Sequence, residues 1–291
     1  MRTNRFYTVL IVILLAMAVP ASNMCMAAGQ AASEEVTLTR VVKVHSAKMG
    51  RDILNTVVVP EQYYDPDFQE EQFPVMYLLH GYDGDYRNWS DKASLEALAS
   101  TYSMIIVCPD GQDSWYVDSP VDPKMQFETY VADELVTFVD DHYRTIPDPK
   151  LRAITGLSMG GHGALSLALR HPDVFGSCGS MSGCVDITQC ADKWKIAKRL
   201  GDYAQNKAEW ESHSVLLMVP TLSTTQNIII DDGTGDVFYE MNLQLHKALL
   251  ERKIAHDFTI RPGAHTWDYW VNSLDYHALF FSKCFDKAFD D

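Results

Sequence analysis

One serine stands in a sequence context that favours nucleophilic chemistry. Gly156-Leu157-Ser158-Met159-Gly160 fits the pattern G-x-S-x-G, with an apolar run (LRAIT) before it and an amphipathic run (ALSLALR) after it. A strand, a sharp turn and a helix in this order would present the Ser158 hydroxyl at the carboxyl edge of a sheet. We predict a strained backbone at Ser158, with Gly156 and Gly160 required because a Cβ at either position would clash. The start of the following helix would favour negative charge beside the hydroxyl.

A serine nucleophile needs a base, and a histidine fills that role most often. In a chain with this strand-turn-helix serine, the acid and then the histidine follow the serine in sequence. The downstream candidates are His171, His213, His246, His256, His265 and His277. His246 and His277 lie in helical patterns and His256 begins a strand, whereas His265 lies in the loop PGAHTW just past the last predicted strand. Such loops reach over the carboxyl edge of a sheet, so we predict His265 as the base.

The acid that orients this histidine is expected at the end of the strand in IIIDDGTGD. Asp231, Asp232 and Asp236 are the candidates there. Asp236 lies a few residues beyond the strand, on a loop able to reach a histidine, and is the prediction. Asp232 is the alternative, and its competing role is that of a turn residue before Gly233.

Acyl chemistry also needs two N–H donors for the developing oxyanion. We expect one from the backbone of Met159, directly after the nucleophile. The other is expected from the backbone of Tyr82 in LLHGYDG, the loop after the first long apolar run. His80, in the same loop, is interpreted as a structural residue rather than a second base.

The elements that position these residues read as an α/β fold. Two alternating runs at 36–45 and 53–60 predict an antiparallel hairpin at a sheet edge. Continuous apolar strands then alternate with helices, which indicates a mostly parallel sheet covered by helices on both faces. The predicted strands lie within 73–81, 104–110, 151–158, 175–183, 227–233 and 255–267, and the helices within 94–100, 129–143, 161–172, 238–253 and 273–281. The region 184–222 reads as irregular, with one helix at 192–200.

Composition bounds the classes of function. The 291 residues are 47% hydrophobic and 22% charged, which is typical of a globular chain. The formal net charge is −15, whereas nucleic-acid-binding proteins usually carry an excess of Lys and Arg that pairs with phosphates. The same charge disfavours an anionic membrane surface.

The N-terminus predicts export. Arg2 and Arg5 precede an apolar run at 7–19, about thirteen residues that are too few to span a membrane. We predict a signal peptide at 1–28, a tether at 29–35 and one catalytic domain at 36–291, in a periplasmic, cell-surface or secreted protein without stable membrane insertion. The alternatives are an uncleaved anchor and a lipoprotein modified at Cys25.

Five cysteines follow the predicted signal, and no C-x-x-C pair suggests a zinc site. Cys184 and Cys190 would either close a short loop in an oxidising compartment or remain separate buried thiols.

The separated motifs occur in an order that resembles the esterase D-like branch of the α/β-hydrolases. They are LLHGYDG, Trp89, PDGQDSWYVDS, ADELVTFVDDHYRT, RAITGLSMGGHGALSLALRHPDVF, DDGTGDVFYEMN and RPGAHTWDYW. That branch includes feruloyl and acetyl xylan esterases, tributyrin-type esterases, S-formylglutathione hydrolases and mycolyltransferases. The resemblance implies an α/β-hydrolase fold, a triad of Ser158, Asp236 and His265, an oxyanion hole of the Tyr82 and Met159 amides, and no metal or organic cofactor. It also implies that the segment 184–222, the least family-like part, helps to wall the substrate pocket.

Aromatic residues near these loops suggest what the substrate is. Trp89, Trp115 and Trp267 are predicted substrate contacts, since aromatic faces bind flat apolar groups. The expected function is a serine esterase acting on short-chain or aromatic acyl esters, with a small-molecule or carbohydrate substrate and plausibly plant polysaccharide. An acyltransferase using the same residues and a non-catalytic carbohydrate-binding protein are the alternatives.

Overall fold

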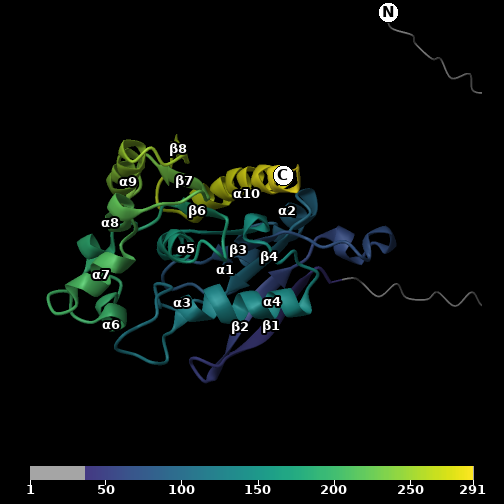
Figure 1. Cartoon of the computed structure of the whole chain (residues 1–291), viewed down its shortest axis with the longest axis horizontal. Coiled ribbons are helices and arrows are strands. Elements are labelled where there is room, and N and C mark those ends of the chain that lie inside the picture. Colours follow the sequence, from purple (N-terminus) through teal and green to yellow (C-terminus); the bar gives the residue numbers. More distant parts are fainter. Residues whose placement is uncertain (1–36, 291) are drawn as a thin grey trace, which may run out of the picture. The chain divides into compact units, whose positions relative to one another are not determined.

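Eight strands form one sheet in the part of the chain that the computed structural model describes, residues 37–290 (Figure 1). The strand order is β1-β2-β4-β3-β5-β6-β7-β8. The pairs β1–β2 and β2–β4 are antiparallel, and every later pair is parallel. The predicted edge hairpin and mostly parallel sheet are therefore confirmed. The strands are β1 (Thr39–Ser46), β2 (Arg51–Val58), β3 (Val75–Leu79), β4 (Ile105–Pro109), β5 (Arg152–Gly156), β6 (Ser177–Met181), β7 (Asn227–Gly233) and β8 (Asp257–Arg261).

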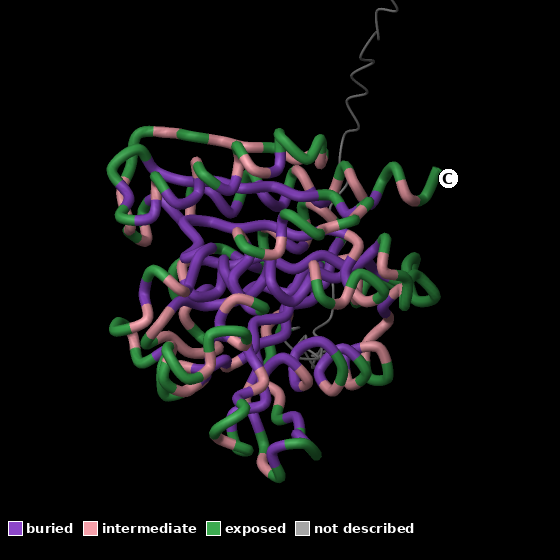
Figure 2. Tube along the Cα trace, turned by 60° about the vertical axis from the view of Figure 1, so that its left-hand side comes forward, coloured by how far each residue is buried: buried purple, intermediate pink, exposed green. Residues whose placement is uncertain are grey.

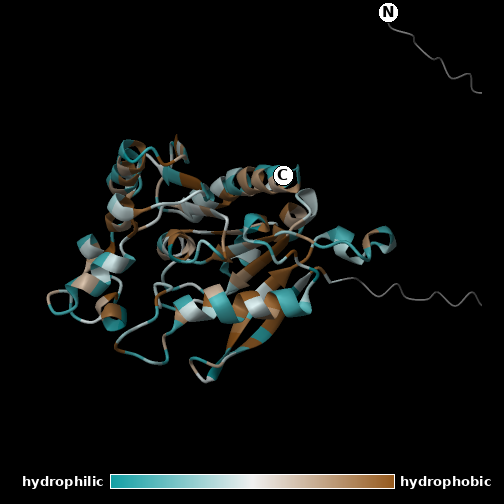
Figure 3. Cartoon of the chain, in the orientation of Figure 1, coloured by the Kyte–Doolittle hydropathy of each residue, from teal (hydrophilic) through white to brown (hydrophobic). Residues whose placement is uncertain are grey.

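Both faces of the sheet are covered, and the central strands β3 to β6 are buried at every position. In β3, Val75, Tyr77 and Leu79 pack into one core, while Met76 and Leu78 pack into the other. The first core is completed by residues of α4 (Val136–His142), α5 (Met159–Arg170) and α9 (Tyr239–Glu251). The second is completed by α2 (Leu95–Thr101) and α10 (Trp267–Asp290). The buried centre and its apolar strands are visible in Figure 2 and Figure 3.

Some elements differ from the sequence-based prediction. The helix predicted at 129–143 begins at α3 (Phe127–Thr129), passes through a π-helical stretch (Tyr130–Leu135) and continues as α4. The region 184–222 contains more helix than expected, and α10 is longer than the predicted 273–281. The remaining helices are α1 (Asn88–Lys92), α6 (Ala197–Leu200), α7 (Lys207–His213) and α8 (Val215–Met218), and the 3-10 turns are Glu61–Tyr64, Pro66–Phe68, Pro149–Leu151, Ile187–Cys190 and Val219–Thr221.

The predicted signal peptide and tether, with the lipidation alternative at Cys25, lie outside the described residues and stay predictions. None of the helices between residues 37 and 290 combines the length and apolar character needed to cross a bilayer.

Candidate active site

Ser158 occupies the turn between β5 and α5. Its backbone has φ 55° and ψ −114°, a combination that is costly for a residue with a Cβ. A Cβ on Gly156 would lie 2.6 Å from the Leu79 carbonyl oxygen, and one on Gly160 would lie 2.6 Å from the carbonyl oxygens of Leu79 and His80. The predicted strain and the predicted need for both glycines are confirmed. The turn places the Ser158 hydroxyl at the carboxyl edge of the sheet and at the N-terminus of a 12-residue helix.

Ser158, His265 and Asp236 form one chain of hydrogen bonds. The His265 Nε2 atom lies 2.9 Å from Ser158 Oγ, and His265 Nδ1 lies 2.9 Å and 3.0 Å from the two carboxylate oxygens of Asp236. A carboxylate can only accept, so Nδ1 carries the proton and Nε2 is left to accept from the serine hydroxyl. The geometry is thus that of a nucleophile, a base and an orienting acid.

Packing and backbone contacts fix this chain. The His265 ring lies edge-on between Phe238 and Trp270, with ring centroids 5.3 Å and 4.8 Å away. The Asp236 side chain is fully buried and also accepts the Phe238 backbone N–H at 2.9 Å. His265 lies in the loop between β8 and α10, and Asp236 in the loop after β7, as the strand pattern predicted.

Asp232, the alternative acid, points elsewhere. Its carboxylate accepts the Asn242 side-chain N–H at 2.7 Å and the Gly233 backbone N–H at 2.8 Å. Burial, followed by the charge of Asp236, raises the pKa of Asp232 to about 8. The carboxyl is therefore largely protonated at neutral pH and makes no hydrogen bond with His265.

The two predicted oxyanion donors, the backbone N–H groups of Tyr82 and Met159, lie in segments next to Ser158. In the part of the chain that the structure describes, neither the Tyr82 nor the Met159 N–H has a hydrogen-bond acceptor. Met159 begins α5, where free N–H groups are available to a ligand. The Tyr82 loop packs closely on the nucleophile, since a Cβ on Gly81 would lie 3.5 Å from Ser158 Cβ.

His80 is a structural residue, as predicted. Its Nε2 accepts the Gly111 backbone N–H at 2.8 Å, so its Nδ1–H donates to the Gly81 carbonyl at 2.7 Å. Burial lowers the pKa of His80, which keeps the ring neutral. The ring therefore joins the loops that follow β3 and β4 and is not available as a base.

A pocket of about 690 Å³ opens beside Ser158 and His265. We call it the Ser158 pocket. The other lining residues come from the loops around the carboxyl edge of the sheet. They are Gly81, Tyr82, Asp83, Gly84, Asn88, Trp115, Leu157, Trp194, Val237, Phe238, Thr266, Trp267 and Trp270. Its lining is dominated by aromatic and aliphatic groups, as in sites for largely apolar ligands.

The structure places two of the three predicted substrate contacts in this lining. Trp115 and Trp267 border the pocket, and Trp89 does not. Trp89 is 1% exposed, donates its indole N–H to the Leu79 carbonyl at 3.0 Å and packs edge-on against Trp267. This corrects the expectation for Trp89, which supports the pocket from the core.

Trp194 and Phe238 also line the pocket and were not among the predicted contacts. Trp194 lies in the segment 184–222, and Phe238 directly precedes α9. Their rings are in edge-to-face contact, with centroids 5.5 Å apart. The resemblance had pointed to this segment as a pocket wall, but nothing in the sequence singled out Trp194.

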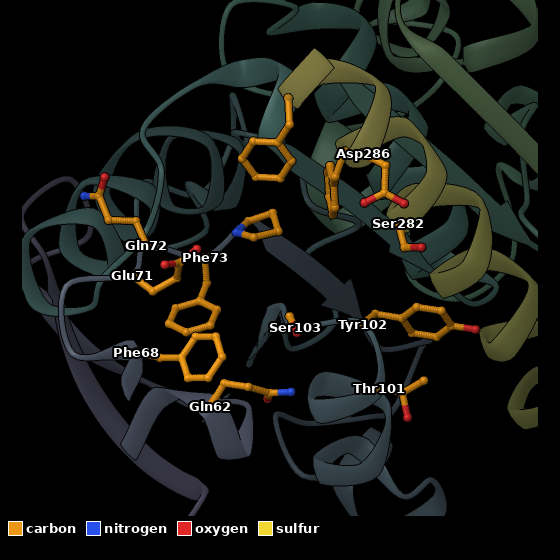
Figure 4. A pocket seen from close by; sticks show the side chains of 13 residues that line it. Gln62, Phe68, Glu71, Gln72, Phe73, Thr101, Tyr102, Ser103, Ser282 and Asp286 are labelled. Carbon is orange, nitrogen blue, oxygen red and sulfur yellow. The ribbon is translucent and has the colours of Figure 1, made fainter. Parts of the chain in front are cut away.

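A second pocket, of about 340 Å³, lies at the other end of the sheet (Figure 4). Its walls include Phe73 and Ser103, which precede β3 and β4, and Ser282 and Asp286 from the last turns of α10. Of the described residues that line it, none is a histidine. The residue type that most often serves as the base for a serine nucleophile is therefore not part of this lining.

Comparisons with known proteins identify a family of esterases. Residues 46–281 match the esterase family, described as "Putative esterase". The chain is 27% identical over 227 residues to an S-formylglutathione hydrolase of Bos taurus, covering 69% of this chain and 79% of that protein. It is 26% identical over 233 residues to an acetyl esterase of Caldicellulosiruptor saccharolyticus, covering 72% and 84%. The solved structure of a ferulic acid esterase superposes with a TM-score of 0.73 at 25% identity, covering 85% of this chain and 100% of that one.

These neighbours share the α/β-hydrolase fold seen here. Because the family match spans most of the sequence, the chain belongs to this esterase family of carboxylic-ester hydrolases.

Proposed function

We propose that this protein is an exported serine esterase in which Ser158 is the nucleophile, His265 the general base and Asp236 the acid that orients it. The observation that carries the proposal is the continuous hydrogen-bond chain, with 2.9 Å from Ser158 Oγ to His265 Nε2 and 2.9 Å from His265 Nδ1 to Asp236. The strained serine backbone at a helix N-terminus supports it, since this is the environment in which negative charge near Oγ is favoured.

Acylation follows from this geometry. As Ser158 Oγ attacks the ester carbonyl carbon, His265 Nε2 takes the hydroxyl proton, and the imidazolium is stabilised by Asp236. The carbonyl oxygen becomes an oxyanion that accepts from the Tyr82 and Met159 N–H groups. Collapse of this intermediate expels the alcohol, which takes its proton from His265 and leaves an acyl group on Ser158.

In deacylation, water replaces Ser158 as the nucleophile, and His265 again acts as the base. Water loses a proton to His265 and attacks the acyl carbon, which releases the carboxylic acid and restores Ser158. An acceptor alcohol in place of water would give acyl transfer with the same residues. Product analysis separates the two, because only transfer yields a new ester.

The substrates that we propose are short-chain or aromatic acyl esters, such as those carried on plant polysaccharide. The aromatic residues that line the pocket, among them Trp115, Trp194 and Phe238, support this class, because aromatic rings bind planar apolar groups well. Two of the similar proteins are described as an acetyl esterase and a ferulic acid esterase. Export rests on the charged and apolar pattern of residues 1–28.

The test is hydrolysis of p-nitrophenyl acetate and methyl ferulate by the protein and by its Ser158→Ala variant. We expect turnover of at least one ester and a loss of at least about 10³-fold in kcat for the variant. Ser212→Ala is the matched control, because Ser212 is an exposed serine outside the pocket lining, and it should retain full activity. Equal activity of Ser158→Ala and the parent would overturn the assignment of the nucleophile.

A further inference from the structure

Two of the buried cysteines lie in contact with each other. Cys184 Sγ and Cys190 Sγ are 3.3 Å apart, with the Cys184 thiol donating to the Cys190 sulfur, and the two residues are 0% and 3% exposed. A disulfide bond is about 2.0 Å long, so closing it requires a shift of little more than about 1 Å. No other pair of cysteines between residues 37 and 290 makes such a contact.

The contact makes one of the two sulfurs reactive. The hydrogen bond from Cys184 lowers the pKa of the Cys190 thiol, helped by the nearby Lys193 ammonium, while the same pairing raises the pKa of Cys184. Burial alone raises the pKa of Cys178 to about 12. Because the thiolate is the attacking species in thiol–disulfide exchange, Cys190 is the better attacking residue of the pair, and Cys178 lacks such a partner among the described residues.

The pair lies between the nucleophile turn and the wall of the Ser158 pocket. The Cys184 backbone N–H donates to the Ser158 carbonyl at 3.4 Å. Cys190 ends the 3-10 turn Ile187–Cys190, and its carbonyl accepts the Lys193 N–H at 2.9 Å, one residue before Trp194. A covalent link between the two cysteines would therefore tie the segment that carries Trp194 to the turn that carries Ser158.

We infer that Cys184 and Cys190 form an intramolecular disulfide by exchange with a disulfide oxidant, and that this bond fixes the Trp194 side of the pocket. The Cys190 thiolate attacks one sulfur of the oxidant, whose S–S bond breaks and whose other half leaves as a thiol after taking a proton. The Cys184 thiol loses its proton and attacks Cys190 Sγ in this mixed disulfide, releasing the second thiol. Two cysteine thiols are thereby oxidised and one oxidant disulfide is reduced to two thiols. The inference does not depend on the proposed esterase activity.

The test counts thiols in the full chain carrying Cys25→Ser, so that the remaining cysteines are Cys108, Cys178, Cys184, Cys190 and Cys284. Protein treated with oxidised glutathione is denatured without reductant, alkylated with N-ethylmaleimide and weighed as the intact chain. We expect two fewer labels than on reduced protein, no attached glutathione, and a non-reducing digest that links Cys184 to Cys190. An undiminished label count, or a link between other cysteines, would overturn the inference.

Matched variants separate this pair from the other thiols. Cys178→Ser removes a buried thiol outside the pair, so the glutathione-dependent loss of two labels must persist. Cys190→Ser must abolish that paired loss. If Cys190→Ser still loses two labels, the bond lies elsewhere and the assignment is wrong.

The effect on the pocket wall is read without any substrate. Hydrogen exchange at residues 191–196 should slow about tenfold in the disulfide form compared with the reduced form. Exchange in α9 serves as the internal reference and should not change. Equal exchange at 191–196 in both forms would show that the bond does not hold this wall.

Discussion

The two sides of the Ser158 pocket are built differently. One side, the sheet-edge wall, consists of Gly81, Tyr82, Ser158 and His265, in the segments that directly follow β3, β5 and β8. The other side, the loop wall, consists of Trp115, Trp194 and Phe238, in the connections that follow β4, β6 and β7. The groups assigned to bond making lie on the first, and rings that can contact an acyl group lie on the second. We therefore expect chemistry and selectivity to depend mainly on different walls, with Phe238 linking the two through its backbone N–H to Asp236.

The backbone of the loop wall depends on contacts within that wall. Trp115 and Tyr116 have φ 58° and 57°, and Trp194 and Lys195 have φ 45° and 54°. Such left-handed positions are unfavourable for bulky residues, at about 1–3 kcal/mol each, and persist only where neighbours hold them. The Trp115 indole N–H donates to the Trp194 carbonyl at 3.2 Å, which joins the two strained pairs. We therefore expect a change at Trp194 to affect this wall more than the turn that carries Ser158.

The largest effect that would test this division is expected at the proposed acid. Asp236→Asn keeps the shape of the side chain but favours the wrong tautomer of His265, because an amide can donate to Nδ1. We expect kcat to fall about 10³- to 10⁴-fold for every ester tested, with little change in KM. Steady-state kinetics on an acetyl and an aromatic ester measure this. A loss confined to one ester would break the division between the walls.

Asp232→Asn is the matched control for that variant. Asp232 is buried beside Asp236, and its raised pKa of about 8 means that a neutral amide resembles the protonated carboxyl at pH 7. Its kcat at pH 7 should stay within about threefold of the parent. A loss as large as that of Asp236→Asn would move the acid role to Asp232.

The sheet-edge wall was predictable from the sequence because short motifs determine it. Apolar strands, a glycine-flanked serine and a histidine just past the last strand each have a local pattern, and the parallel sheet brings their ends together. The choice between Asp232 and Asp236 was harder, since both lie near the same strand end. The structure separates them, because Asn242 and Gly233 hydrogen-bond to Asp232 while His265 contacts Asp236.

The loop wall was less predictable because long-range packing decides it. Trp89 and Trp267 are both tryptophans near the same loops, yet one is in the core and the other borders the pocket. Residue type does not tell which side of a short helix such as α1 faces inward. The placement of Trp194 depends on non-glycine residues at positive φ, for which a single sequence gives no signal.

A smaller, substrate-dependent effect is expected in the loop wall. Trp194→Ala removes a ring that contacts Phe238 and borders the pocket. We expect KM for methyl ferulate to rise about tenfold, the order of one lost aromatic contact, while kcat/KM for p-nitrophenyl acetate changes by less than about threefold. Trp194→Phe keeps a ring and should recover most of the loss. Equal losses on both esters would show that the loop wall also supports the chemistry.

The smallest effect concerns how the stability of the protein depends on pH through Asp232, which is buried beside Asp236. Burial and the Asp236 charge raise the pKa of Asp232 from its ordinary 3.8 to about 8 in the folded protein. Between these two values the folded state keeps a proton that the unfolded chain loses, so this group's contribution to stability is full below about pH 4 and declines as the pH rises through about 8. Asp232→Asn removes that titration. Thermal unfolding of both proteins from pH 5 to pH 9 should therefore show the Tm of the variant rising relative to the parent by several degrees across this range. A constant difference would mean that Asp232 is ionised in the fold, and two adjacent carboxylates would then lie behind His265.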